Sequence, residues 1–195
     1  MNYIQVLQGI MKKWELNKSK DIDKGIESNF NTLSMKKIFI IGVILLIVLS
    51  LIPVKVLLAK DFKTGDYIKS WKIKDKDTFL VEHTHSVQLT TVSEKYLIDK
   101  EDIILMESIF HSFGAGLPAT TPYNFELTDG GFRIYDINQK MEALVYRAGA
   151  ERANHRLIYN GLQYNFLDFT EPRTGVRFTI GRIPNILFII REGLN

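Results

Sequence analysis

The chain has 195 residues, and its hydrophobic fraction of 46% is enough to fill the core of one domain that carries an appendage. The net charge of the chain is +3, and its positive excess lies in residues 1–59, which hold eight Lys against four acids, a balance of 8 − 4 = +4. Residues 60–195 hold seventeen Lys and Arg against eighteen acids, a balance of 17 − 18 = −1. The second part therefore has no basic excess for binding nucleic acid. Without cysteine, the chain also has no thiol nucleophile, disulfide, lipoprotein attachment or Cys-based metal site.

Residues 1–35 are expected to form a cytoplasmic N-terminal segment. Ile4, Leu7, Met11 and Trp14 recur at helical spacing, which predicts a short amphipathic helix that rests on the inner leaflet of a membrane. An equally good interpretation is that Met35 is the true first residue and that the preceding part is a poorly ordered extension. The sequence does not choose between the two.

Residues 36–59 are predicted to be a transmembrane anchor. The chain carries no charge from Ile38 to Val54, and its apolar character resumes after Lys55 as far as Ala59. A helix needs about 20 apolar residues to cross the hydrocarbon core, and this stretch reaches that length if the Lys55 ammonium snorkels to the interface. A helix with no polar face is not expected on a soluble protein.

The charges beside this segment predict its orientation. Lys36 and Lys37 precede it, with five more lysines upstream, so the positive-inside rule places the N-terminus in the cytoplasm and residues 60–195 outside. The expectation is a single-pass protein of the cell membrane. A cleavable signal peptide from Met35 is the alternative, but the apolar run is long for one, and Leu57 stands where a cleavage site needs a small residue.

Residues 60–195 are predicted to be an all-β domain, a compact antiparallel β-sandwich or barrel. Short runs of β-branched and aromatic residues alternate with turn residues at intervals of roughly ten, and no long helical periodicity is present. The expected strands are 66–74, 78–87, 92–98, 103–112, 131–137, 142–148, 155–159, 162–169, 176–183 and 185–190.

Two local signals refine this pattern. Asn160-Gly161 lies between two expected strands and predicts a type I′ hairpin turn, which needs positive φ at both central residues. Pro184 separates the last two expected strands, and because it lacks an N–H it marks a corner or an edge.

His83 and His85 are two residues apart on an expected strand, so their side chains share one face. If the chain turns near residues 89–91, Glu94 lies opposite His85, where a carboxylate raises the pKa of an imidazole and orients it. The ordinary alternative is that these residues form the polar face of a strand. No third ligand has a diagnostic spacing, so no metal site and no cofactor are predicted.

The segment "HSFGAGLPATTP" at residues 111–122 is the second candidate feature. Gly114 and Gly116 permit positive φ or a close backbone approach, and Pro118 fixes the exit of the loop. We expect this loop beside the strand with His85 and Glu94. The candidate binding cleft then consists of His85, Ser86, Glu94, Ser112, Gly114 and Gly116.

The combination of Phe79, "HSV" at 85–87, Glu94 and "FHSFGAGLP" at 110–118 resembles the bacterial family numbered eighteen-fifty among the domains of unknown function. The resemblance extends over roughly residues 66–182. It implies a small protein, often with an N-terminal hydrophobic anchor, that is commonly encoded beside components of TAXI-type TRAP transporters, which import carboxylates and related solutes.

Two functions are therefore expected. The first is a membrane-anchored accessory or binding module outside the cytoplasmic membrane that works with a transporter permease or solute-binding subunit. The alternative is an extracytoplasmic hydrolase in which His85 is the base, Glu94 orients it and Ser112 is the nucleophile. Ser86 is a poorer nucleophile because it follows His85 directly and points to the opposite face of a strand.

Overall fold

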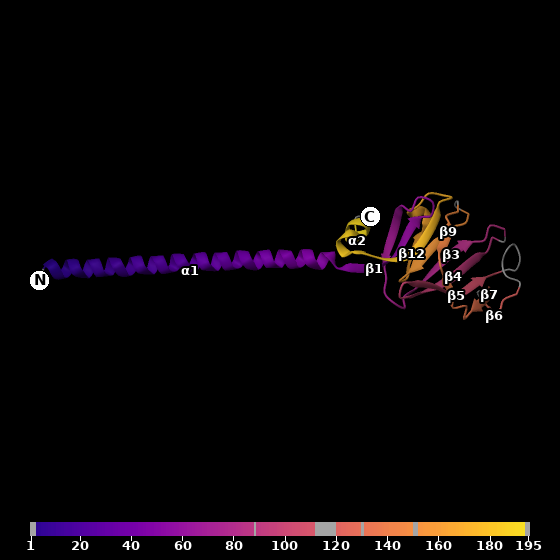
Figure 1. Cartoon of the computed structure of the whole chain (residues 1–195), viewed down its shortest axis with the longest axis horizontal. Coiled ribbons are helices and arrows are strands. Elements are labelled where there is room, and N and C mark those ends of the chain that lie inside the picture. The colour runs from indigo at the N-terminus through magenta and orange to yellow at the C-terminus, as the bar shows by residue number, and fades with distance from the viewer. Residues whose placement is uncertain (1–2, 88, 112–119, 130, 150–151, 194–195) are drawn as a thin grey trace. The chain divides into compact units, whose positions relative to one another are not determined.

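The computed structural model describes residues 3–87, 89–111, 120–129, 131–149 and 152–193. The chain divides into two units, Met1–Ile52 and Pro53–Asn195. The first contains one long helix, and the second contains all the strands (Figure 1).

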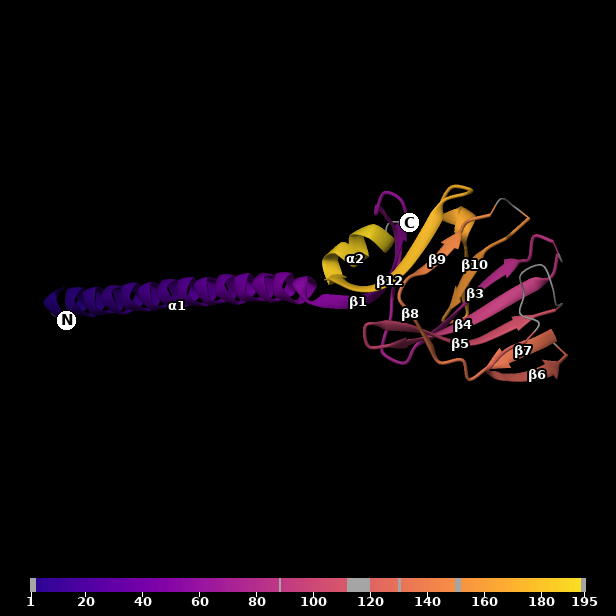
Figure 2. The same ribbon diagram turned by 45° about the vertical axis from the view of Figure 1, so that its right-hand side comes forward.

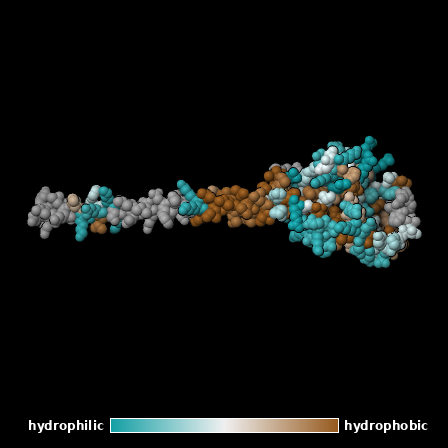
Figure 3. Space-filling model, viewed as in Figure 1, coloured by the Kyte–Doolittle hydropathy of each residue, from teal (hydrophilic) through white to brown (hydrophobic). Residues whose placement is uncertain are grey.

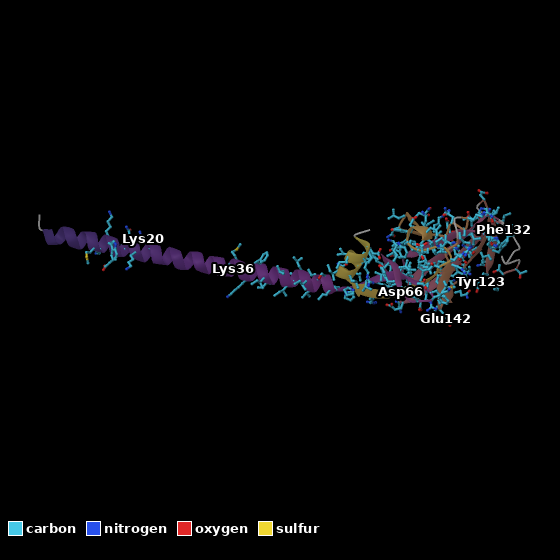
Figure 4. All side chains as sticks on the ribbon, turned by 90° about the horizontal axis from the view of Figure 1, so that it is seen from above. Lys20, Lys36, Asp66, Tyr123, Phe132 and Glu142 are labelled. Carbon is cyan, nitrogen blue, oxygen red and sulfur yellow. The ribbon has the colours of Figure 1, made fainter. Side chains whose placement is uncertain are left out.

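A single helix, α1, extends from Tyr3 to Leu51. It ends just before Pro53, because proline has no N–H for the helix and disfavours helical geometry in the residue before it. Within the described residues, no helix satisfies the length and hydropathy expected of a membrane span. The last part of α1, from Ile38 to Leu51, is nevertheless apolar and exposed, and forms the continuous hydrophobic stretch of the helix in Figure 3. Lys36, labelled in Figure 4, and Lys37 immediately precede this stretch.

The predicted boundary of the apolar helix at Ala59 is wrong. Pro53–Asp61 is strand β1, and its residues Val56, Leu57 and Ala59 are fully buried in the β-domain. The apolar character after Lys55 therefore belongs to a buried strand, not to the end of a longer helix. A run of apolar residues does not itself distinguish these two origins.

The β-domain consists of two antiparallel sheets (Figures 1 and 2). The smaller has the order β2-β1-β12-β9 and the larger the order β11-β10-β3-β4-β5-β7-β6, with β8 paired to β5. The strands after β1 are β2 (Tyr67–Lys72), β3 (Thr78–Thr84), β4 (Thr91–Asp99), β5 (Asp102–Phe110), β6 (Asn124–Thr128), β7 (Gly131–Tyr135), β8 (Gln139–Met141), β9 (Leu144–Arg147), β10 (Arg156–Tyr159), β11 (Leu162–Asn165) and β12 (Gly175–Pro184). The all-β prediction is confirmed as antiparallel sheets, and no closed barrel is found in the described part of the domain.

One hydrophobic core joins the two sheets. Leu57, Trp71 and Phe178 of the smaller sheet and Phe79 and Tyr96 of the larger one belong to the same buried cluster. The Trp71 ring meets the Phe178 ring at a centroid distance of 6.2 Å, and Phe79 stacks on Tyr96 at 5.2 Å. In β3, β4, β10 and β12 the buried residues are separated by partly exposed ones, as the period of two predicts. The inner faces therefore hold the sheets together.

The Asn160-Gly161 turn is confirmed. Their φ angles are 51° and 74°, and strands β10 and β11 pair directly on either side of them. A short 3-10 helix, Phe166–Asp168, follows β11 and buries Phe166.

The last predicted strand is wrong, because Asn185–Glu192 is helix α2. Pro184 ends β12 opposite Pro53, so the sheet does not continue beyond it. The Glu192 carboxylate accepts hydrogen bonds from the backbone N–H of Ser70, at 2.8 Å, and from the Tyr67 hydroxyl. This contact with β2 stabilises the helix, although its Ile residues favour β-strands.

Candidate functional site

The strand pairing fixes which residues are neighbours of Glu94. On β3 its partner is Val81, and on β5 its partner is Ser108. His83 lies two residues from Val81 on the same face, whereas His85 lies four residues away, about 13 Å along the strand. The prediction that Glu94 lies opposite His85 is therefore wrong, and His83 is its diagonal neighbour. The prediction that His83 and His85 share one face agrees with their common position on the cleft described next.

A cleft of about 500 Å³ opens on this face of the larger sheet, and we call it the β4 cleft. Its polar lining is His83, His85, Glu94, Ser108, Thr120, Thr121 and Gln139; its apolar lining is Val92, Leu105, Pro122, Tyr123, Ile134 and Ile137. Figure 4 places Tyr123 and Phe132 toward the same end of the β-domain, away from Asp66. The cleft therefore combines a few polar groups with apolar walls, which is typical of small-molecule sites.

Glu94 is held by two tyrosines at the inner side of the cleft. The Tyr146 hydroxyl, from β9 of the smaller sheet, donates to Oε2 of Glu94, and the Tyr96 hydroxyl lies 3.2 Å from the same oxygen. The two hydroxyl oxygens are 2.6 Å apart. Since each hydroxyl has one proton, the shortest contacts are satisfied when Tyr96 donates to Tyr146 and Tyr146 donates to Glu94. This chain links the two sheets through one carboxylate.

Both tyrosines remain protonated donors in this arrangement. Burial raises the pKa of the Tyr146 and Tyr96 hydroxyls, and the negative charge of Glu94 raises both pKa values further. A buried hydroxyl that lost its acceptor would destabilise the fold, because no hydrogen bond would replace those it makes to water in the unfolded chain. The Glu94 carboxylate is thus a structural partner of the tyrosines as well as a wall of the cleft.

A pair of stacked histidines lies beside this network. The rings of His83 and His155 have centroids 5.1 Å apart and an interplanar angle of 9°. The backbone N–H of Gly149 lies 3.3 Å from Nδ1 of His155, which makes this nitrogen an acceptor and places the ring proton on Nε2. Nδ1 of His83 is buried and has no hydrogen-bond partner among the described residues.

Burial keeps both stacked rings neutral. Burial, together with a smaller contribution from the nearby His83, lowers the pKa of His155 to about 4. Burial also lowers the pKa of His83; the charge of Glu94 opposes this shift without reversing it, and His85 adds to it. Two neutral rings stack without the repulsion that two imidazolium ions would suffer.

The structure brings together part of the predicted cleft. His85 and Glu94 both line it. Ser86 lies in an exposed turn and does not line it. Ser112, Gly114 and Gly116 lie outside the described residues, so the expected role of the glycine loop stays a prediction.

Sequence reasoning missed Tyr146, His155 and Ser108 as neighbours of this site. Ser108 needed the register of β4 against β5, and Tyr146 needed the packing of one sheet on the other. His155 lies 72 residues from His83 in the sequence, with no diagnostic spacing, although β10 pairs directly with β3. No local signal in the sequence marks such contacts.

The geometry of Glu94 bears on the predicted pairing of a histidine base with an orienting carboxylate. Glu94 is engaged by Tyr146 and does not lie opposite His85, so the arrangement of base and orienting carboxylate expected for a hydrolase is not formed by the strand register. Among the described residues, no group of three or more His, Asp or Glu side chains is placed to hold a metal ion.

A known family matches the part of the chain that lines this cleft. Residues 79–166 match the model of the family described as Domain of unknown function (DUF1850). Through these residues the chain belongs to the DUF1850 family. The match begins at Phe79 in β3 and ends at Phe166, so it includes His83, His85, Glu94 and His155 of this DUF1850 domain. No curated protein and no solved structure matches the chain.

Proposed function

We propose that this DUF1850 protein is a membrane-anchored accessory module whose β-domain lies outside the cytoplasmic membrane and binds a small ligand. The observation that carries the binding role is the β4 cleft, in which polar groups from β3, β4 and β5 converge between apolar walls. Its carboxylate is fixed by hydroxyl donors rather than paired with a nucleophile, which favours binding over covalent catalysis.

The anchoring role rests on the apolar part of α1. From Ile38 to Leu51 the large side chains are exposed, so a helical stretch of 14 residues, about 21 Å long, has no polar face for water. This is shorter than a hydrocarbon core of about 30 Å, and thinning of the bilayer together with snorkelling of Lys36 and Lys37 would accommodate the difference. By the positive-inside rule, these lysines support a cytoplasmic N-terminus.

The proposed partner is the permease or the solute-binding subunit of a TAXI-type TRAP transporter, as the family resemblance implies. An edge of the β-domain supports docking of a partner. Strand β6 is the last strand of the larger sheet, and its Phe125 and Leu127 are 45% and 72% exposed. Exposed apolar side chains on the last described strand of a sheet favour association with another protein.

The membrane topology is tested with single cysteines, since the chain has none of its own. Lys63→Cys, in the β-domain, should react with a membrane-impermeant maleimide in intact cells. Lys20→Cys, in the N-terminal unit, should react only after the cells are permeabilised. The reverse pattern, or equal labelling of both in intact cells, contradicts the proposed orientation.

The partner is tested by photo-crosslinking in intact cells from two exposed positions. A crosslinking amino acid at Leu127, on β6, should capture a transporter subunit, whereas the same amino acid at Leu162, on the opposite edge strand β11, should not. Deletion of the gene should reduce uptake by the transporter. Unchanged uptake, or equal capture from both positions, would show that the protein is not an accessory of this transporter.

A further inference from the structure

The charge of the β4 cleft indicates which ligand it accepts. Glu94 is the only Asp, Glu, Lys or Arg among the described residues that line it. An anionic ligand would therefore meet a carboxylate and no permanent cation. Because unlike charges attract and like charges repel more strongly in a partly desolvated cleft than in water, this lining disfavours a simple carboxylate.

The geometry of Glu94 leaves one of its oxygens for a ligand. The two tyrosine hydroxyls both approach Oε2. Oε1 has no hydrogen-bond partner among the described residues, although a carboxylate accepts at both oxygens. The tyrosine chain holds the carboxylate in place, so little orientational freedom is lost when a donor binds Oε1.

The apolar walls lie on the same sheet. Val92 and Ile134 are about 5% exposed or less and belong with Ile137 to a small hydrophobic cluster under the cleft. Glu94 and Ser108 are cross-strand neighbours, and Ser108 in turn pairs with Ile134 of β7. Glu94, Ser108 and Ile134 therefore lie in one row across the sheet, where a carboxylate, a hydroxyl and an apolar side chain are neighbours.

We propose that the β4 cleft binds a small organic cation, with its ammonium group on Oε1 of Glu94 and its apolar body against Val92 and Ile134. This inference deepens the proposed binding role of the module by naming the class of ligand. A charge-assisted hydrogen bond to the carboxylate provides selectivity for the cation, and the apolar contacts provide the remaining affinity.

Three probes of nearly equal size test this proposal on the full chain in detergent at pH 8. They are phenethylamine, 2-phenylethanol and phenylacetate, and their dissociation constants are measured by ligand-observed NMR. Phenethylamine should bind at least about tenfold more tightly than phenylacetate, with the alcohol between them, since a hydrogen bond to a charged group is worth a factor of ten or more.

Substitutions test whether Glu94 is the cause of the preference for the amine. Glu94→Gln should remove the preference for the amine, whereas Glu101→Gln, which removes an exposed carboxylate elsewhere on the domain, should keep it. If Glu94→Gln does not fold, judged by circular dichroism, Glu94→Asp keeps the charge and should retain the order of the probes with weaker binding.

Three results would overturn the proposal: no binding of phenethylamine, tighter binding of phenylacetate, or an unchanged preference in folded Glu94→Gln. These outcomes are separate from those of the crosslinking experiment. Preference for phenylacetate would reject the ammonium ligand and leave a binding module, whereas failure to capture a transporter subunit would remove the partner without changing the order of the probes.

Discussion

The stacked His83 and His155 rings predict that mild acid destabilises the β-domain. The folded pKa of His155 is about 4, below the ordinary value of 6.5 that applies in the unfolded chain. The unfolded chain therefore binds more protons between these two values, and the free energy of unfolding falls as the pH falls from about 6.5 toward 4. Below pH 4 this loss is complete, and above pH 6.5 the stabilisation is fully present.

The size of this loss in the free energy of unfolding follows from the shift in the pKa of His155. Linkage between pKa values of 6.5 and 4 gives a loss of about 2 kcal/mol between pH 7 and pH 5, since one pKa unit corresponds to about 1.4 kcal/mol. The ring is partly accessible to solvent, so we halve this figure to about 1 kcal/mol. His83 acts in the same direction, since burial lowers its pKa as well.

The matched variant is His155→Phe, which keeps an aromatic ring beside Phe166 but cannot titrate. It should lose stability at pH 7, about 1 kcal/mol, because the N–H of Gly149 loses its acceptor. Its free energy of unfolding should nevertheless fall less than that of the wild type, by about 1 kcal/mol, between pH 7 and pH 5.

Urea unfolding followed by fluorescence measures this difference. The chain has two tryptophans, so a Trp14→Phe background leaves Trp71, which is buried in the core of the β-domain, as the reporter. Equal pH dependence in His155→Phe and the parent would refute the reasoning. A His155 pKa of 6.5 or higher, measured by NMR titration of its ring, would refute it independently.

Three further substitutions test the fold and the site, each through the free energy of unfolding. Gly131→Ala should cost about 2 kcal/mol or more, since φ is 110° and the new Cβ would lie 2.6 Å from a backbone oxygen. Gly65→Ala, at φ 78° with open space around the new Cβ, should cost about 1 kcal/mol, and equal costs for the two substitutions would contradict this reasoning. Tyr146→Phe should cost about 1–3 kcal/mol because Glu94 loses a donor, and Tyr135→Phe, whose hydroxyl has no hydrogen bond in the described structure, should be nearly neutral. Phe178→Ala should cost about 3–5 kcal/mol because its ring is 1% exposed in the core, and a loss below 1 kcal/mol would show that the core is wrongly placed.

Most of the β-domain was predictable from the sequence because its signals are local. The alternation of side chains along β3 and β4 indicates burial of one face, and Asn160-Gly161 indicates a turn that requires positive φ. Strands β6 and β8 were not predicted, because they are short and most of their side chains are exposed, which weakens the alternation.

Local patterns in the sequence are sufficient to predict the antiparallel all-β class, the apolar stretch after Lys37 and two residues of the cleft, His85 and Glu94. Contacts between distant parts of the chain place Val56 to Ala59 in a buried strand, make residues 185–192 a helix, and set Glu94 beside Val81 and Ser108. The physical reason is that apolar runs and β-branched residues suit more than one structure, and the choice depends on which surfaces they contact. The bond from Tyr146 to Glu94 shows this most clearly, since it joins residues 52 positions apart on different sheets and exists only because the sheets pack face to face.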